Sequence, residues 1–150
     1  MGRWLVSRGM EGEAGPAGGD RFGDMLGLEY LDTSPEEVRA RAPVADHLLQ
    51  PVGLVHGGVY SAIAESVCSA ATWLAVHDQG LAAMGQSNSA TFLRPITEGH
   101  VNALARPRHR GRTTWVWDVE ITDDDGRLCA LVRMTVAVRA VSSPAAERSG

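Results

Sequence analysis

The stretch from Gln50 to Trp73 constrains the fold of this chain most strongly, because it combines a glycine turn with a helix that has almost no polar face. It reads QPVGLVHGGVYSAIAESVCSAATW, and the helical pattern continues to His77 before Gly80 ends it. A helix that is apolar nearly all round must be covered by other elements. Its many alanine and serine residues allow those elements to approach closely. We therefore expect one long central helix, from about Gly58 to His77, inside the domain.

The segments on either side of this helix have the pattern of β-strands. Two precede it and four follow it, at residues 28–33, 36–44, 81–94, 99–109, 113–122 and 127–140. The clearest is 113–122, in which the bulky side chains of Trp115, Trp117, Val119 and Ile121 share one face. The turn DDDG that follows predicts a hairpin, because Asp-Gly tolerates positive φ angles. The order of elements predicts an α+β fold, with a mostly antiparallel sheet wrapped around one helix.

One domain with a tail at each end is expected. The 150 residues are 44% hydrophobic and 21% charged, which suits a single globular core. We assign the domain to residues 20–141, beginning with a short helix at residues 20–26. Residues 1–19 and 142–150 are rich in small residues that bury little surface, and we expect both tails to be disordered.

Composition and charge exclude several classes of function. The net charge of −4 gives no general attraction to nucleic acid or to an anionic membrane. No apolar run is expected to span a bilayer, and no signal peptide is recognised. Cys68 and Cys129 lie in apolar stretches without a disulfide framework, so a reducing, cytoplasmic location is expected. The five histidines lack metal-ligand spacing, and no metal site is predicted.

One carboxylate, Glu65, lies in the middle of the apolar helix. Ser61, Ser69 and Thr72 fall at i−4, i+4 and i+7, so the four residues form a polar stripe. In a structural interpretation the hydroxyls bond back to helix carbonyls and Glu65 lies at the rim of the domain. In a functional interpretation the carboxylate is a nucleophile or a general base. The apolar flanks of Glu65 favour the functional interpretation.

The turn His56-Gly57-Gly58 immediately precedes the helix. Amides at a helix N-terminus point outward and carry positive partial charge, and glycine lets a ligand approach the backbone. The turn therefore suits an oxyanion site for an acyl carbonyl. The alternative is an ordinary glycine turn with a structural histidine. A glutamate eight residues after Gly57 favours the oxyanion site.

An arginine cluster follows at residues 106–112, which read RPRHRGR. Four of the 14 arginines of this net-acidic chain lie there. The cluster is either a solvated hairpin tip or a binding site for a polyphosphate, for which guanidinium groups are suited. Both interpretations remain open on the sequence. A single short patch without a stacking platform does not predict a nucleic-acid-binding protein.

Several stretches together resemble the hotdog-fold acyl-CoA thioesterases, over about residues 44–140. They are GLVHGGVYSAIAES, GQSNSATFLRP, EGHV, TTWVWDV and GRLCALVRMTVAV. The 4-hydroxybenzoyl-CoA thioesterase type, with glutamate on its helix, is the most similar. The resemblance implies that Gly57 donates its amide to the thioester oxygen and that His56 shapes this turn. It also implies that Glu65 attacks the carbonyl or activates water, that Ser69 orients Glu65 or the water, and that Gln50 positions the thioester.

The resemblance further implies a homo-oligomer, a dimer or a dimer of dimers (a homotetramer), with active sites at subunit interfaces. Because the turn and the carboxylate lie more than two helical turns apart, each site would need two copies of the stretch. Coenzyme A is part of the substrate, and no resident cofactor is expected. Its nucleotide would lie near the candidate residues Arg110, Arg112, Thr113 and Thr114.

The expected function is hydrolysis of an acyl-CoA, of an aromatic kind used in aromatic catabolism, to the free acid and CoA. Pro51, Val52, Ser89 and Ala90 depart from the family pattern near the expected acyl pocket, so the acyl group is not fixed by the resemblance. Two alternatives are a hotdog hydratase or dehydratase that acts on acyl thioesters, and a non-catalytic acyl-CoA-binding protein. Release of free thiol distinguishes a thioesterase from both.

Overall fold

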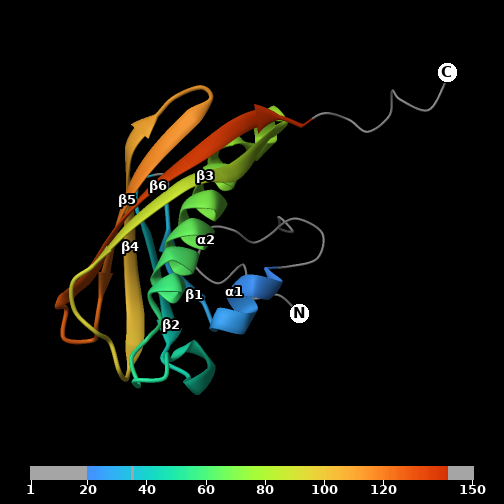
Figure 1. Ribbon diagram of the computed structural model, residues 1–150. Coiled ribbons are helices and arrows are strands. Elements are labelled where there is room, and N and C mark those ends of the chain that lie inside the picture. The colour runs from blue at the N-terminus through green and yellow to red at the C-terminus, as the bar shows by residue number, and fades with distance from the viewer. Residues whose placement is uncertain (1–19, 35, 142–150) are drawn as a thin grey trace.

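The computed structural model describes residues 20–34 and 36–141 (Figure 1). The predictions for the two tails lie outside the described residues. The elements in chain order are α1 (Arg21–Leu26), β1 (Glu29–Thr33), β2 (Val38–Pro43), the 3-10 turn η1 (Asp46–Leu48), α2 (Gly57–Val76), the 3-10 turn η2 (His77–Gln79), β3 (Leu81–Phe92), β4 (His100–Arg110), β5 (Thr114–Thr122) and β6 (Leu128–Ala140). Every helix and strand predicted within residues 20–141 is present, with bounds that differ by a few residues.

The six strands form one sheet in the order β1-β2-β4-β5-β6-β3, and neighbouring strands are antiparallel. Figure 1 shows this sheet curving around one side of α2, while α1 lies on the other side. The α+β prediction is confirmed. β3 returns directly from the end of α2 and becomes the last strand of the sheet, next to β6. The helix that carries the candidate residues therefore lies along a sheet edge.

The alternation read in β5 places its bulky face against α2. Trp117, Val119 and Ile121 are fully buried, and Trp115 is nearly so. Burying an aliphatic side chain such as Val119 or Ile121 contributes roughly 1.5–3 kcal/mol to the stability of the fold. Nε1 of Trp117 also donates a hydrogen bond to Oγ1 of Thr72 at 3.0 Å, and that hydroxyl donates to the carbonyl of Cys68 at 2.8 Å. This chain of hydrogen bonds fixes the depth of α2 on the sheet.

Within the described residues α2 is not enclosed all round, which corrects the expectation from sequence. Ile63, Ala64 and Val67 are fully buried in the core, whereas Glu65, beside the edge strand β3, is exposed. By length and hydropathy the helical run Gly57–Gln79 could also cross a membrane, contrary to the expectation from sequence. Half of its apolar window is buried inside the domain, so it is the core helix of this fold.

A β-bulge in β3 determines which of its side chains face α2. Gly85 pairs with Val136 and Ser87 pairs with Thr135, so Gln86 is one residue too many for the ladder. An extra residue reverses the alternation of faces beyond it. Before the bulge the helix-facing residues are Ala83 and Gly85; after it they are Asn88, Ala90 and Phe92.

Candidate active site

The turn that begins α2 is organised by its own histidine. His56 is the N-cap residue, and its Nδ1 accepts a hydrogen bond from the Gly58 amide at 2.9 Å. A nitrogen that accepts a hydrogen bond carries no proton, so the ring proton of His56 lies on Nε2. The side chain is exposed. His56 thus satisfies one amide of the helix N-terminus and leaves the neighbouring Gly57 amide uncommitted.

The Gly57 amide is the free donor of this turn. No hydrogen bond within the described residues uses it. A Cβ atom on Gly57 would lie 2.8 Å from Cε2 and Cζ of Phe92, so the space beside this backbone is filled by the phenylalanine ring. Only glycine allows that close packing. The outcome is a donor N–H at the positive end of a helix with an aromatic ring beside it.

A cavity of about 380 Å³ opens next to Gly57. Its lining is mostly apolar and comes from the segment before α2, the first turn of α2 and the end of β3: Gln50, Leu54, Val55, Gly57, Tyr60, Phe92, Leu93, Arg94 and Pro95. The Tyr60 and Phe92 rings lie 5.9 Å apart and are tilted by 50°. Burial raises the pKa of Tyr60, so its phenol stays neutral. Such a cavity accepts an apolar, ring-sized group beside a hydrogen-bond donor.

Gln50 reaches this cavity because a tight loop holds it there. The backbone N–H of Gln50 donates to the backbone carbonyl of Leu54 at 2.9 Å, and the backbone carbonyl of Gln50 accepts from the Gly53 N–H at 2.9 Å. Gly53 has a φ of 81°, which favours glycine at this loop position. The structure therefore brings Gln50 and Gly57 together on the wall of one cavity.

Glu65 and Ser69 lie further along α2. Glu65 is exposed, and its carboxylate packs against β3: a Cβ atom on Gly85 would lie 2.7 Å from Oε1. The buried Oγ of Ser69 has no hydrogen-bond partner within the described residues. Leaving a buried hydroxyl without a partner costs about 1–3 kcal/mol, so this group is available for a bound water or substrate. Thr72 lies in the core, which corrects its assignment to the polar stripe.

The two groups of candidate residues are separate within one chain. Gly57 and Glu65 are eight residues apart on one helix, which corresponds to about 12 Å of helix rise. A single thioester carbonyl cannot reach both at hydrogen-bond distance. The first group is the Gly57 amide beside the cavity. The second group is the Glu65 carboxylate with the Ser69 hydroxyl.

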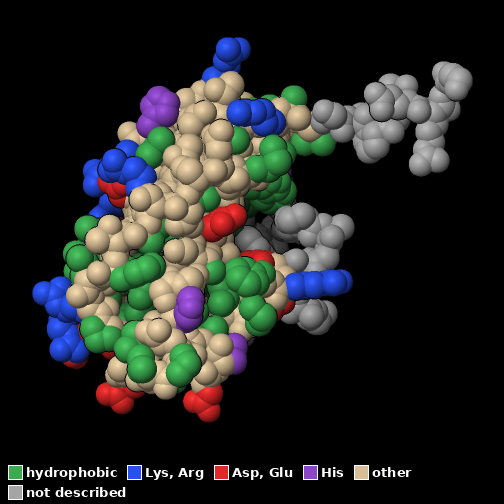
Figure 2. Space-filling model, in the orientation of Figure 1, with side chains coloured by type: hydrophobic (Ala, Val, Ile, Leu, Met, Phe, Trp, Pro, Cys, Tyr) green, Lys and Arg blue, Asp and Glu red, His purple; other side chains and the backbone are tan. Residues whose placement is uncertain are grey.

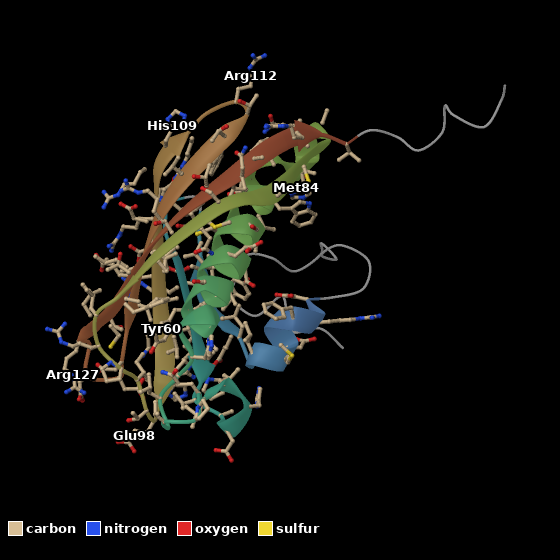
Figure 3. All side chains as sticks on the ribbon, in the orientation of Figure 1. Tyr60, Met84, Glu98, His109, Arg112 and Arg127 are labelled. Atoms are coloured by element: carbon tan, nitrogen blue, oxygen red, sulfur yellow. The ribbon has the colours of Figure 1, made fainter. Side chains whose placement is uncertain are left out.

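The predicted nucleotide-binding residues lie at the tip of the β4–β5 hairpin. Figure 3 shows Arg112 at the upper end of the sheet, with Tyr60 toward the lower end. Arg110 lies 3.7 Å from a Glu36 oxygen, and its guanidinium is 5.4 Å from the centre of the Trp115 ring. Arg112 is exposed and forms no ion pair among the described residues. Within this chain the tip does not meet the cavity.

The other arginines of the cluster belong to a network on the outer face of the sheet. Arg106 pairs with Glu37 at 2.7 Å, and Arg108 pairs with Asp118 at 2.7 Å. Asp118 also accepts from Arg133 at 2.8 Å, and these guanidinium groups, Arg133 foremost, hold the pKa of Asp118 below its ordinary value. Figure 2 shows positive side chains along the sheet side and the upper end of the molecule. For Arg106 and Arg108 the structural interpretation therefore holds.

Sequence reasoning missed the helix-facing residues of β3 and the aromatic wall of the cavity. Gly85, Asn88 and Phe92 face α2 because of the bulge at Gln86, for which the sequence carries no recognised signal. Tyr60 could have been found, because it follows the glycine turn by one helical turn. Among the residues that the structure describes, no three His, Cys, Asp or Glu side chains are grouped as they would be to hold a metal ion.

Comparisons with known proteins agree with this geometry. Residues 52–130 match the family model of the thioesterase superfamily. The Mycobacterium tuberculosis protein Rv1847, which is named as an esterase, is 43% identical over 111 residues, 73% of this chain and 79% of its own. The proofreading thioesterase EntH of Cronobacter turicensis is 36% identical over 113 residues, 75% of this chain and 82% of its own.

A solved structure extends the agreement to three dimensions. A mutant form of thioesterase PA1618 from Pseudomonas aeruginosa superposes with a TM-score of 0.77 at 38% identity, over 80% of this chain and 86% of that one. The predicted hotdog fold, a sheet wrapped around one helix, is confirmed. The chain belongs to the thioesterase superfamily, a family of thioester hydrolases.

Proposed function

We propose that this enzyme hydrolyses acyl-CoA thioesters with an aromatic acyl group, of the 4-hydroxybenzoyl-CoA kind, to the free acid and CoA. The observation that carries the proposal is the uncommitted Gly57 amide beside an apolar, aromatic-walled cavity. The relatives named as thioesterases support the reaction. Coenzyme A belongs to the substrate, and the residues proposed here need no resident cofactor.

The Gly57 amide would polarise the thioester carbonyl. Negative charge develops on that oxygen as the carbonyl carbon becomes tetrahedral, and a helix N-terminus stabilises it. Gln50 lies on the same cavity wall and would position the thioester through its side-chain amide. The role of His56 is to hold the turn, because its ring occupies the Gly58 amide and leaves Gly57 free.

The cavity would hold the acyl group. Its volume of about 380 Å³ lies in the range of small-molecule sites, which is roughly 300–1,000 Å³. Tyr60 and Phe92 offer ring faces and edges to a planar group, and aromatic pairs favour separations of about 4.5–7 Å. These two side chains are the support for an aromatic rather than a straight-chain acyl group.

Glu65 would supply the base or the nucleophile. As a base it takes a proton from water while the water oxygen bonds to the carbonyl carbon; the C–S bond then breaks and the CoA thiolate takes up the proton. As a nucleophile its oxygen displaces CoA to form a mixed anhydride, which water hydrolyses. In either case the Ser69 hydroxyl, buried and without a partner in the described chain, would orient the water or the carboxylate.

A second copy of the chain would complete each site. β3 is a 12-residue edge strand that carries no charged side chain, and its residues from Met84 to Ser89 are exposed. A long, uncharged edge is a ready template for pairing with another strand. The opposite edge, β1, has five residues and includes Glu29 and Asp32. We therefore place the dimer contact at β3.

Antiparallel pairing of two β3 strands about a centre between Asn88 and Ser89 inverts the second chain. The Gly85 end of one strand then lies beside the Phe92 end of the other, which brings Glu65 of the partner subunit to the level of Gly57. The same inversion moves the partner's hairpin tip, with Arg110, Arg112, Thr113 and Thr114, toward this end. Arg112 is the cation there without an ion pair among the described residues, so it is proposed to bind a CoA phosphate.

The proposal extends to the cellular setting and the assembly state. Cys68 and Cys129 are both free and buried thiols, which supports the proposed cytoplasmic location. A dimer accounts for two complete sites, and the pairing of two dimers into a tetramer remains a prediction that sedimentation analysis can test.

The test is thiol release from benzoyl-CoA by purified wild type, Glu65→Gln and Glu65→Ala. The kcat of both variants should fall by at least about two orders of magnitude, which is the usual effect of removing a key catalytic group. Wild-type turnover in either variant would refute the role of Glu65. Hydration of an α,β-unsaturated acyl-CoA without release of free thiol would favour the hydratase alternative. Tight binding across an acyl-CoA panel without turnover would favour a non-catalytic binding protein.

A further inference from the structure

The Glu65 carboxylate occupies space that a side chain at Gly85 would fill. A Cβ atom on Gly85 would lie 2.7 Å from Oε1 and 3.1 Å from Cδ of Glu65. Gly85 does not have a positive φ angle, so its backbone conformation is open to any residue. An added methyl group would therefore displace the carboxylate, and also Cε of Met134 at 2.9 Å, whereas the conformation of the strand does not require glycine.

A hydrogen bond close by ties the same part of β3 to the same part of α2. Nδ2 of Asn88 donates to the backbone carbonyl of Ser61 at 2.9 Å. That carbonyl lies one helical turn before Glu65, at the position that accepts the Glu65 amide in an α-helix. The bulge at Gln86 lets Gly85 and Asn88 both face the helix although they are three residues apart. One hydrogen bond and one close approach thus place the strand beside the Glu65 turn.

We propose that Gly85 is a positioning residue for Glu65, and that Asn88 holds the strand in register with the helix turn. The inference rests on the proposed catalytic role of Glu65. An exposed glutamate has three rotatable side-chain bonds and adopts many rotamers unless its surroundings restrict them. The recess left by the missing Gly85 side chain restricts the carboxylate to one place. Preorganisation of this kind acts on the chemical step rather than on substrate binding.

The size of the recess determines the expected effect of a methyl group. Ordinary contact between a Cβ atom and a neighbouring atom begins near 3.4 Å, so Oε1 would have to retreat by about 0.7 Å from its present 2.7 Å. A misplacement of about 1 Å can cost roughly a hundredfold in rate. Gly85→Ala should therefore lower kcat by about 10- to 100-fold. KM should stay within about twofold, because the cavity beside Gly57 is untouched.

The experiment measures kcat and KM for benzoyl-CoA hydrolysis, together with thermal unfolding and oligomeric state. Glu120→Gln is the control, because Glu120 is an exposed position on β5, away from β3 and from the cavity, and should leave kcat unchanged. The Tm of Gly85→Ala should be no lower than that of wild type, because alanine is favoured over glycine in a strand. Asn88→Asp, which removes the donor but keeps the shape, should also lower kcat. A wild-type kcat for Gly85→Ala overturns the inference.

A second variant separates positioning of Glu65 from packing of the core. The added methyl would also lie 2.9 Å from Cε of Met134. Met134→Leu removes that atom, so Gly85→Ala/Met134→Leu should stay as slow as Gly85→Ala. Recovery of kcat in the double variant, or loss of the oligomer in Gly85→Ala, would overturn the inference. Wild-type activity in Glu65→Ala would refute the proposed function itself, which is a different outcome from full activity in Gly85→Ala alone.

Discussion

Replacing Thr72 with valine removes the acceptor of a buried tryptophan N–H and leaves the shape of the side chain almost unchanged. Thr72 is fully buried; its Oγ1 accepts from Nε1 of Trp117 at 3.0 Å and donates to the Cys68 carbonyl at 2.8 Å. In Thr72→Val the indole N–H keeps its burial but loses its partner. An unsatisfied buried donor costs about 1–3 kcal/mol. For a chain of this length that loss lowers Tm by roughly 2–12 °C.

The assay is urea unfolding followed by tryptophan fluorescence, at one fixed protein concentration because the chain is proposed to be a dimer. The midpoint should fall while the m value stays constant. Thr72→Ser is the control: it keeps both hydrogen bonds and loses one methyl group, which costs about 1 kcal/mol. The kcat of Thr72→Val should remain at the wild-type level, because the hydroxyl lies in the core and not beside Glu65.

A double-mutant cycle with Trp117→Phe tests the hydrogen bond itself. In that background no indole N–H remains, so Thr72→Val should cost less than about 0.5 kcal/mol. The reasoning is refuted if Thr72→Val costs as much there as in the wild type, or if Thr72→Val alone is as stable as wild type.

Two further predictions concern the outer face and the free edge of the sheet. The pKa of Asp118 is lowered in the folded protein, first by the hydrogen bond from Arg133 and also by Arg108. Ionised Asp118 therefore stabilises the fold at pH values above its unfolded pKa of about 4. This stabilisation is lost as the pH falls through the lowered pKa of the folded state. Asp118→Asn should therefore lower Tm at pH 7. The difference in Tm between this variant and wild type should disappear as the pH is lowered below 4. A difference in Tm that does not depend on pH would contradict the role given to the Asp118 carboxylate. Ser89→Lys places two like charges near the middle of the proposed β3 pairing and should give an inactive monomer by sedimentation analysis, whereas Ser89→Ala stays dimeric. A fully active Ser89→Lys monomer would exclude the shared site.

The fold was predictable where the periodicity of a segment had one physical cause. β5 lies on the core with one face only, so its alternation gave the buried tryptophans directly. The glycines that end α2 and the last hairpin, Gly80 and Gly126, have φ angles of 70° and 77°, as such positions require. The free amides of the turn at His56 to Gly58 followed from the chemistry of a helix N-terminus, whereas the choice of Gly57 as the donor came from the family resemblance.

The parts that could not be predicted depend on irregularity and on tertiary cover. The bulge at Gln86 changes the face on which Asn88 and Phe92 lie, and a strict period of two assigns them wrongly. Thr72 and Glu65 fall on one side of an ideal helix, yet one is buried and the other exposed. A twisted sheet crosses the helix obliquely, so the covered side changes along its length. Helical spacing alone does not report that change.

The separation of Gly57 from Glu65 along one helix has a genetic consequence. In the proposed dimer each site takes its amide from one subunit and its carboxylate from the other. A chain defective at Gly57 and a chain defective at Glu65 are each inactive alone, but together they assemble one intact site and one doubly defective site. Random pairing of equal amounts should restore about a quarter of the wild-type activity. Two recessive alleles of this gene would then complement each other, although both lesions lie in the same helix.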